Sequence, residues 1–442
     1  MPNANTDLAA CVAEAERHYI SARPESRRLN AIAAEAMPGG NTRTILFYTP
    51  FPSVLARGSG CRVIDVDGHE YLDFLGEYSA GLYGHDEPRI RRAIEDALAD
   101  GIVLGGPNRH EIELAYLLKE RIPSLELLRF CNSGTEANLF AISAARTFTG
   151  RDSVLVFHHA YHGGLSSFGT VGAKINAPFP WLLGSYNEIP SALALIERSA
   201  AELAAVLIEP MQGASGCIPA NAAFLQALRD SCTRHGIVLI FDEVMTSRCG
   251  PGGLQARLGI RPDMTTLGKY LGGGLAFGAF GGRREIMQLF DPSRPDALPH
   301  AGTFNNNVLA MAAGVAGLRE VFTRSECERL FGLGERLREG VNELAARLGV
   351  PIVATGVGSM VGLHFHDGPI SSAETFDGLP PEGKDRRGLL KKLFHLDMLE
   401  KGVYLSRRGF VSLSLPMRER ETETFLTAIE EFIGERRSLL RL

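Results

Sequence analysis

One lysine of this 442-residue chain stands in a setting that suits covalent chemistry. Lys269 lies between the hydroxyl-bearing pair Thr265-Thr266 and the glycine run 272–274. A lysine amine becomes a nucleophile when burial or a nearby cation lowers its pKa, and it then forms a Schiff base with an aldehyde or ketone. The alternative is a lysine at a turn whose stem packs on apolar surface. The other lysines lie in a solvated helix face, a loop or charged C-terminal segments: Lys119, Lys174, Lys384, Lys391, Lys392 and Lys401.

A second stretch has the composition of a phosphate cradle. Ser133, Gly134 and Thr135 directly follow the apolar run 127–131 and open a predicted helix. The backbone N–H groups at a helix start, together with two hydroxyls, suit an anion such as phosphate. The alternative is an ordinary serine or threonine cap at the start of the helix.

An aspartate closes another apolar run of the chain. Asp242 ends the run 237–242, where a carboxylate is costly to bury without a positive partner. A protonated pyridine nitrogen would be such a partner. A structural salt bridge and a helix cap are the alternatives.

A cluster of aromatic residues follows the apolar run 153–157. Tyr161 lies in this cluster, and an aromatic ring can stack on a flat cofactor. Three histidines nearby raise the alternative of a metal site. Because the chain has no H-E-x-x-H pattern and no carboxylate at a matching spacing, we expect no metal there. The three histidines are His158, His159 and His162.

These four stretches together supply the parts that a pyridoxal 5'-phosphate (PLP) site requires. PLP needs a lysine for its Schiff base and an acid at its pyridine nitrogen. The acid keeps that nitrogen protonated, so the ring accepts electrons when the substrate Cα–H bond breaks. The displaced lysine can then carry the proton. The sequence therefore predicts PLP as the cofactor.

The size and composition limit the other classes of function. A length of 442 residues suits two domains, or one large domain with a smaller one. The net charge of −5 gives no case for a nucleic-acid partner. Seven scattered cysteines without a C-x-x-C indicate reduced thiols. Because acidic residues interrupt the N-terminus and no apolar run nears about 20 residues, we expect a cytoplasmic protein without a membrane partner.

The order of predicted elements indicates an α/β fold. Between about residues 88 and 320, helical stretches alternate with short apolar runs that are typical of buried parallel strands. In such sheets, ligands gather beyond the carboxyl ends of the strands. We predict an N-terminal segment (1–75) of helices and a hairpin that packs with the small domain, a large PLP-binding domain (76–322) and a small C-terminal α+β domain (323–442). The predicted strand runs are Leu127–Cys131, Ser153–Phe157, Ala205–Glu209, Ile237–Asp242 and Met264–Leu267.

Across essentially its whole length, the chain resembles the class III aminotransferases of PLP fold type I. The resemblance implies a large domain with a mainly parallel central sheet flanked by helices, plus a smaller α+β domain. It rests on motifs that follow the family's order: Ser133-Gly134-Thr135-Glu136-Ala137, Tyr161-His162-Gly163, Glu209-Pro210, Asp242-Glu243-Val244, Lys269 and Gly302-Thr303-Phe304.

The resemblance also implies a role for each matching residue. Lys269 would form the Schiff base and carry the proton, and Asp242 would pair with the pyridine nitrogen. Tyr161 and Val244 would sandwich the ring. Thr303 would reach the phosphate of the neighbouring subunit, so a homodimer would share its active sites. The phosphate would also be held by Ser133, Gly134 and Thr135.

Within the class, the chain resembles the glutamate-1-semialdehyde aminomutases and, more closely, the aromatic β-amino-acid aminotransferases. Ala214 stands where many class III enzymes carry a gating glutamate, and Ser412 or Leu413 where they carry a late arginine. Arg43 matches the arginine that holds the substrate carboxylate in the mutases. Arg408 falls where the mutases have an acid, and its planar fork suits a second carboxylate.

These departures favour an aminotransferase over a mutase. The predicted reaction moves the amino group of an aromatic β-amino acid to 2-oxoglutarate or pyruvate by a ping-pong mechanism, with Arg43 on the donor and Arg408 on the acceptor. Glutamate-1-semialdehyde 2,1-aminomutase is the alternative. A silent PLP-binding protein is a further rival, which the presence of Lys269 and Asp242 opposes. Aromatic side chains expected to line the substrate pocket are Phe47, Tyr48, Phe51 and Tyr78.

Overall fold

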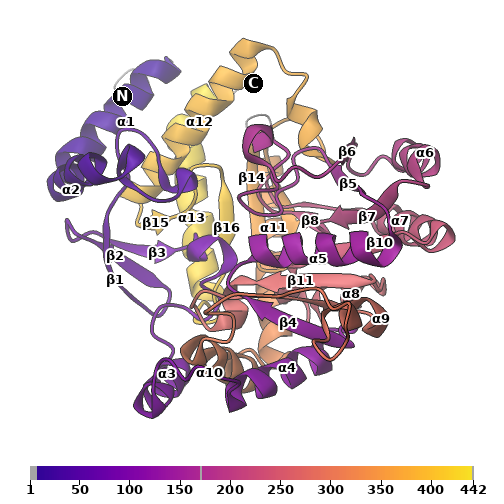
Figure 1. Cartoon of the computed structure of the whole chain (residues 1–442). Helices are drawn as coiled ribbons and strands as arrows, with labels where there is room; N and C mark the ends of the chain where they lie inside the picture. Colours follow the sequence, from indigo (N-terminus) through magenta and orange to yellow (C-terminus); the bar gives the residue numbers. More distant parts are fainter. Residues whose placement is uncertain (1–6, 170–171, 441–442) are drawn as a thin grey trace.

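The computed structural model describes residues 7–169 and 172–440 of the chain. A seven-stranded sheet lies at the centre of the larger half of the molecule (Figure 1). Its strands are β4 (Leu127–Cys131), β5 (Ser153–Phe157), β6 (Trp181–Gly184), β7 (Leu203–Ile208), β10 (Val238–Asp242), β11 (Met264–Gly268) and β12 (Gly278–Gly282). They are arranged in the order β4-β12-β11-β10-β7-β5-β6.

The sheet is mainly parallel, as predicted. Strand β10 runs parallel to both β11 and β7, and β5 runs parallel to both β7 and β6. Only β12 is antiparallel to its two neighbours, β11 and β4, so the described strands of this sheet otherwise share one direction. The carboxyl ends of β10 and β11 therefore lie side by side, and Asp242 pairs with Thr266 across them.

Strand β12 was not predicted from the sequence because three of its five residues are glycine. Its sequence is Gly-Ala-Phe-Gly-Gly, which carries no strand pattern. A Cβ at Gly278 would lie 2.3 Å from the carbonyl oxygen of Ser133, and one at Gly282 would lie 2.2 Å from that of Asp263. Close backbone approach on both sides therefore requires glycine in this strand.

Helices cover both faces of this sheet. Successive residues of a strand point to opposite faces, so Leu239 and Phe241 pack in one apolar cluster, and Val238 and Ile240 in another. The first cluster includes residues of α6 and α7, and the second residues of α5 and α9. The helices of this half are α3 (Pro88–Asp100), α4 (Arg109–Arg121), α5 (Gly134–Thr149), α6 (Ile189–Ser199), α7 (Ala222–His235), α8 (Gly253–Leu258), α9 (Arg284–Met287) and α10 (Val308–Ala316).

The N-terminal elements pack against the C-terminal ones. Helices α1 (Leu8–Ala22) and α2 (Pro24–Ala36) meet at the predicted break, and α1 contacts α12 (Pro381–Glu400). The predicted hairpin around Asp67-Gly68 is confirmed by the pairing of β2 (Arg62–Asp65) with β3 (Glu70–Asp73), and β1 (Leu55–Ser59) pairs with β2. The distant strand β15 (Val403–Tyr404) adds to β3 in the same sheet.

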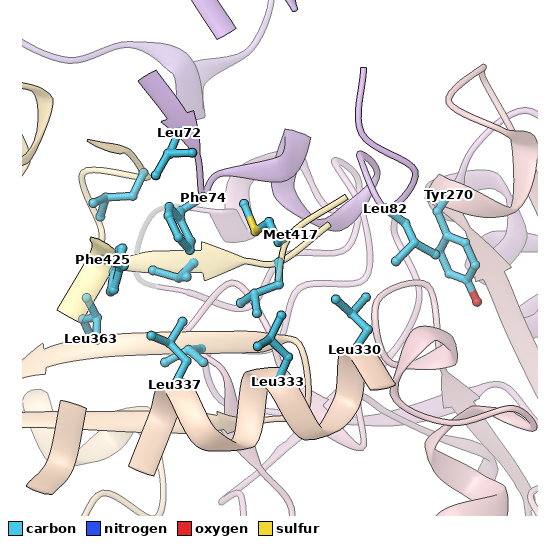
Figure 2. Packing of buried hydrophobic residues seen from close by; sticks show 14 of the residues in the cluster. Leu72, Phe74, Leu82, Tyr270, Leu330, Leu333, Leu337, Leu363, Met417 and Phe425 are labelled. Atoms are coloured by element: carbon cyan, nitrogen blue, oxygen red, sulfur yellow. The ribbon is translucent and has the colours of Figure 1, made fainter. Parts of the chain in front are cut away.

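The last third of the chain is α+β. A three-stranded sheet, β13 (Ile352–Val357), β14 (Met360–Phe365) and β16 (Phe410–Ser412), packs with α11 (Arg324–Leu348), α12 and α13 (Glu419–Arg436). No local pattern predicted the strands β13 and β14 individually. Figure 2 shows leucines of α11 facing Met417 and Phe425 across the core. The domain boundaries at 75 and 322 stay predictions.

Among the described residues, no helix is both long and apolar enough to cross a membrane.

Candidate active site

The reactive lysine predicted from the sequence lies just beyond the end of β11. Lys269 opens a short 3-10 turn (Lys269–Gly272) and adopts a left-handed backbone, with φ of 58°. Its Nζ donates a hydrogen bond of 2.6 Å to the carbonyl oxygen of Tyr78. The Lys269 amine, which follows a strand of the large sheet, therefore contacts a backbone carbonyl of the N-terminal segment.

The surroundings of Lys269 prepare its amine for attack. Burial above all, and then the nearby guanidinium of Arg43, lower the pKa of Lys269 to about 8, although the carboxylate of Asp242 opposes the shift. A larger fraction of neutral amine is therefore present near neutral pH than for an exposed lysine.

A buried network holds the carboxylate of Asp242. Its Oδ2 accepts hydrogen bonds from Nδ1 of His162 at 2.8 Å and from Nδ2 of Asn138 at 2.9 Å. Its Oδ1 accepts one from the backbone N–H of Val244 at 3.1 Å. The amide of Asn138 is oriented by the hydroxyl of Thr266, which donates to Asn138 Oδ1 at 2.7 Å. Asp242 is thus a fixed acid at the strand end, as a partner of a pyridine nitrogen must be.

Sequence reasoning named neither Asn138 nor His162 as a site residue. Asn138 lies one helical turn after Gly134, and His162 directly follows Tyr161, so both neighbour predicted positions. The contact of each with Asp242 depends on the packing of α5 and of the segment after β5 against β10, which no local pattern reveals.

A second buried acid orients the backbone of Tyr161. Glu209 accepts hydrogen bonds from the N–H of Tyr161 at 2.9 Å and from that of Gly213 at 3.0 Å. Burial raises the pKa of Glu209 to about 7, and His162 opposes that rise. Tyr161 remains 47% exposed, so its ring is free to cover a ligand.

The predicted phosphate cradle lies at the start of α5, where Ser133 also has the alternative role of a helix cap. Ser133 is the N-cap of α5, and its Oγ accepts a hydrogen bond from the N–H of Glu136 at 3.2 Å. The hydroxyl of Thr135 accepts one from the N–H of Gly164 at 3.1 Å. The first amides of a helix have no acceptor within the helix, so those of Gly134 and Thr135 suit an anion.

Glycines bring the walls of this site close together. A Cβ at Gly134 would lie 2.8 Å from a methyl carbon of Val244, and one at Gly268 would lie 3.2 Å from the other. A Cβ at Gly163 would lie 2.3 Å from Oγ1 of Thr135. Val244 therefore sits against the backbone of both the cradle and the lysine strand, beside the acid at Asp242.

Both predicted substrate arginines lie near Tyr78. Arg43 makes an ion pair with Glu77, and its guanidinium lies over the ring of Tyr78, 5.5 Å from the centroid. Burial raises the pKa of Tyr78, and both Arg43 and Arg408 oppose that rise, so both guanidiniums act on one phenol. Arg408 is exposed and makes no ion pair with a residue that the structure describes. The ring of Tyr78 stacks on Phe410 at 5.8 Å.

The predicted aromatic pocket is wrong in two of its four residues. Tyr48 and Phe51 are 6% and 8% exposed and pack in a core cluster, where the hydroxyl of Tyr19 bonds to both the hydroxyl of Tyr48 and the carbonyl of Phe51. An aromatic residue serves a core as well as a pocket, and composition does not separate the two roles. Phe47 is 52% exposed, and Tyr78 lies at the site.

The structure does not bring Thr303 into the site of its own chain through any described contact. Thr303 is exposed on the turn before α10. No group of three metal-ligating side chains occurs in residues 7–169 and 172–440.

The residues that come together fit PLP. An amine, a fixed carboxylate, an aromatic ring and a helix start surround one place, which matches the aldehyde, the pyridine nitrogen, the ring face and the phosphate of the cofactor. Within the described chain, two buried polar atoms beside them have no hydrogen-bond partner, Oε1 of Gln212 and Nε2 of His162. A polar group bound there would satisfy such atoms.

Comparison with known proteins gives the same class. The pattern of the family Aminotransferase class-III matches residues 47–432. The chain is 49% identical to the β-phenylalanine transaminase of Variovorax paradoxus, over 100% of this chain and 99% of that protein. The crystal structure of the β-phenylalanine aminotransferase from that organism has a TM-score of 0.95 and 49% identity, over 98% of this chain and 99% of that one.

Two further solved structures are similar. A transaminase with PLP bound has 34% identity and a TM-score of 0.84, over 94% of this chain and 98% of that one. A glutamate-1-semialdehyde aminomutase of Pseudomonas aeruginosa PAO1 has 26% identity and a TM-score of 0.86, over 97% and 98% of the two chains. With both the sequence pattern and the fold in agreement, the chain belongs to the class III aminotransferases of PLP fold type I and is a PLP-dependent transaminase.

Proposed function

We propose that this transaminase takes the amino group of an aromatic β-amino acid and passes it to 2-oxoglutarate or pyruvate in two ping-pong half-reactions. One observation carries the proposal. Arg43 and Arg408 both lie near Tyr78, and the backbone carbonyl of Tyr78 accepts the hydrogen bond from the Lys269 amine. The relative from Variovorax paradoxus, a β-phenylalanine transaminase, supports the choice of donor.

Two arginines answer a geometric problem. A β-amino acid carries its carboxylate one carbon further from the amine than a 2-oxo acid carries its carboxylate from the ketone. The site must therefore bind a carboxylate at two positions in the two half-reactions. We assign Arg43 to the β-amino acid and Arg408 to the 2-oxo acid, since a guanidinium binds carboxylates in a two-point geometry. Glu77, the present partner of Arg43, would be exchanged for the substrate.

The residues around Lys269 divide the remaining work. PLP, when bound, supplies an electron sink for the cleavage of the substrate Cα–H bond. Lys269 Nζ would hold the cofactor and then move the proton, which its lowered pKa favours. Asp242 would hold the proton on the pyridine nitrogen, and Tyr161 and Val244 would contact the two ring faces. The phosphate would be bound by Ser133, Gly134 and Thr135.

We also propose a cytoplasmic homodimer with shared sites. Thr303 and its neighbour Phe304, which is 61% exposed, lie on one turn without a described role inside the chain. In this proposal Thr303 binds the phosphate in the partner's site. Sedimentation of the purified enzyme as a monomer with full activity would contradict it.

A donor panel tests the proposed substrate. β-Phenylalanine, α-phenylalanine and 2-phenylethylamine are each offered with 2-oxoglutarate or pyruvate, and amino-acid formation from the oxo acid is measured. We expect turnover with β-phenylalanine to exceed that with the other two donors. Preference for α-phenylalanine would reject the β-amino-acid assignment, and turnover of an amino-aldehyde without any oxo acid would favour a mutase.

A further inference from the structure

A strained turn of the N-terminal segment carries the carbonyl that contacts the Lys269 amine. Four consecutive residues, Gly76, Glu77, Tyr78 and Ser79, have φ values of 52°, 46°, 52° and 78°. Three of them are not glycine, and the left-handed conformation costs roughly 1–2 kcal/mol for each such residue. Strain of this kind persists only where the surroundings impose it, and it often occurs at functional sites.

A buried arginine grips the end of this turn. Arg248, only 1% exposed, lies in the short 3-10 segment after Asp242 (Thr246–Cys249). Its Nη1 donates to the carbonyl of Ser79 at 3.1 Å and to Oγ of Ser412 at 3.0 Å. Its Nε donates to Oγ of Ser359 at 3.0 Å, and its Nη2 donates to the carbonyl of Leu413.

The acceptors of Arg248 are all neutral, which is unusual for a buried cation. A buried charge is normally paired with an opposite charge, because removing it from water is costly. Arg248 makes no ion pair with a described residue. Burial lowers the pKa of Arg248 to about 10, a value at which it still carries its charge at neutral pH. Packing alone does not account for retaining a cation there, since an apolar side chain of similar volume would avoid the cost.

We propose that Arg248 is a positioning residue for Lys269. By holding the carbonyl of Ser79, it fixes the left-handed turn and therefore the adjacent carbonyl of Tyr78, which accepts the 2.6 Å hydrogen bond from the Lys269 amine. Two cationic side chains, from the segments that follow β10 and β11, thus donate hydrogen bonds to successive carbonyls of one strained turn. The unpaired charge of Arg248 also disfavours protonation of Lys269.

The same contacts link the lysine to the C-terminal part of the chain. Ser359 lies between β13 and β14, and Ser412 ends β16. A Cβ at Gly76 would lie 3.2 Å from the carbonyl of Ser412, so the strained turn rests directly on β16. Arg248 therefore joins three parts of the chain at the point where the amine is placed. The role holds for any amino donor, so it stands or falls independently of the proposed β-amino-acid substrate.

The test compares two equally buried arginines. Arg23 is also 1% exposed, but it bonds to Tyr71 and Glu400, away from the site, so Arg23→Met is a matched control for Arg248→Met. The full-length variants, freed of cofactor, are labelled with acetic anhydride across a pH series. The extent of modification at Lys269 is read by mass spectrometry, and the kcat and KM of each PLP-loaded variant are measured in parallel.

The expected results separate a positioning role from a structural one. In Arg248→Met, we expect the labelling midpoint of Lys269 to rise by about one pH unit toward the ordinary lysine value. Turnover should fall by roughly 10- to 100-fold with little change in donor KM, since the lost placement matters for the chemical step. Arg23→Met should leave the Lys269 midpoint at its wild-type value.

Ser412→Ala keeps the inference testable if Arg248→Met does not fold. This variant removes a single neutral acceptor of Arg248, and we expect a smaller shift of the Lys269 midpoint in the same direction. A wild-type midpoint in folded Arg248→Met, or in Ser412→Ala where the first variant fails to fold, would overturn the assignment. An equal shift in Arg23→Met would also overturn it, because general loosening would then suffice.

Discussion

The two sides of Lys269 are built in different ways. On the side proposed for the cofactor ring, Asp242 receives hydrogen bonds from His162, Asn138 and a backbone N–H, all at 2.8–3.1 Å. On the side proposed for substrate, Arg408 is exposed and the Arg43 side chain is partly exposed, and Arg43 holds a carboxylate that substrate can replace. The hydrogen bonds of the first arrangement hold the Asp242 carboxylate in one position, and we call this the fixed side. The second arrangement leaves its cations free to bind different carboxylates, which a two-substrate reaction requires, and we call this the adaptable, or substrate, side.

The largest effect should come from the residue that both sides share. Lys269→Ala removes the amine that would hold the cofactor and carry the proton, so we expect turnover to fall by at least roughly 10⁴-fold. Borohydride reduction with PLP, followed by mass spectrometry, should label the wild-type peptide and not that of the variant. Lys391→Ala serves as a control, since the pKa of Lys391 is also lowered to about 8 by burial. A labelled and active Lys269→Ala enzyme would contradict the site.

The next effect tests the fixed side. Asp242→Asn keeps the size of the side chain and removes its charge, so the pyridine nitrogen loses the group that holds its proton. We expect turnover to fall by roughly 100- to 1,000-fold, as for the loss of one preorganised electrostatic contact. Asn138→Ala removes a positioning contact at 2.9 Å and should cost much less. Equal losses of turnover in the two variants would show that turnover depends on the hydrogen-bond network and not on the charge of Asp242.

The fixed side could be predicted from the sequence because its parts follow strand ends. Asp242 closes one apolar run and Lys269 directly follows the end of another strand, and parallel strands place such ends along one edge. The Oγ of Ser133 caps α5, which is the alternative role stated for it from the sequence. His162 and Asn138 could not be assigned, because their task is a contact across elements that the local sequence does not encode.

The substrate side was harder to predict for a physical reason. Its residues come from segments far apart in the chain, around Arg43, Tyr78 and Arg408, and their closeness depends on the packing of the N-terminal elements against the C-terminal ones. Arg248 gave no signal because its partners are neutral serines and carbonyls. A sequence pattern can indicate a charge that pairs with an opposite charge, but it gives no sign of a cation whose acceptors are backbone carbonyls and serine hydroxyls.

A third prediction tests the adaptable side. Arg408→Gln should raise the KM for the 2-oxo acid by about 10- to 100-fold, because a charge-assisted hydrogen bond contributes roughly 1.5–3 kcal/mol. The KM for the amino donor should change far less. Arg407→Gln is the matched control, since Arg407 is also exposed but acts on His395 instead of Tyr78. An equal rise in both variants would remove the proposed role of Arg408.

The smallest predicted effect is on stability and contrasts the histidines of the two sides. His162 on the fixed side faces the carboxylate of Asp242, whereas His395 is buried in α12 behind the substrate side, near the cations Arg407 and Arg23. Burial foremost, and Arg407 next, lower the pKa of His395 to about 3. The unfolded chain then binds a proton that the folded chain refuses between pH 6.5 and about 3.

The free energy of unfolding should therefore decrease as the pH falls through that window. Replacing the side chain in His395→Leu should flatten the slope below pH 6 by up to about 1.4 kcal/mol per pH unit, the value for one proton. Urea unfolding at pH 7, 6 and 5 measures the slope. His18→Gln is the control, since the His18 side chain is 63% exposed and pairs with Glu400. An unchanged slope in His395→Leu would mean that His395 accepts a proton in the folded protein, so this face of α12 admits water. The core behind the substrate side would then be as open to solvent as the substrate side itself.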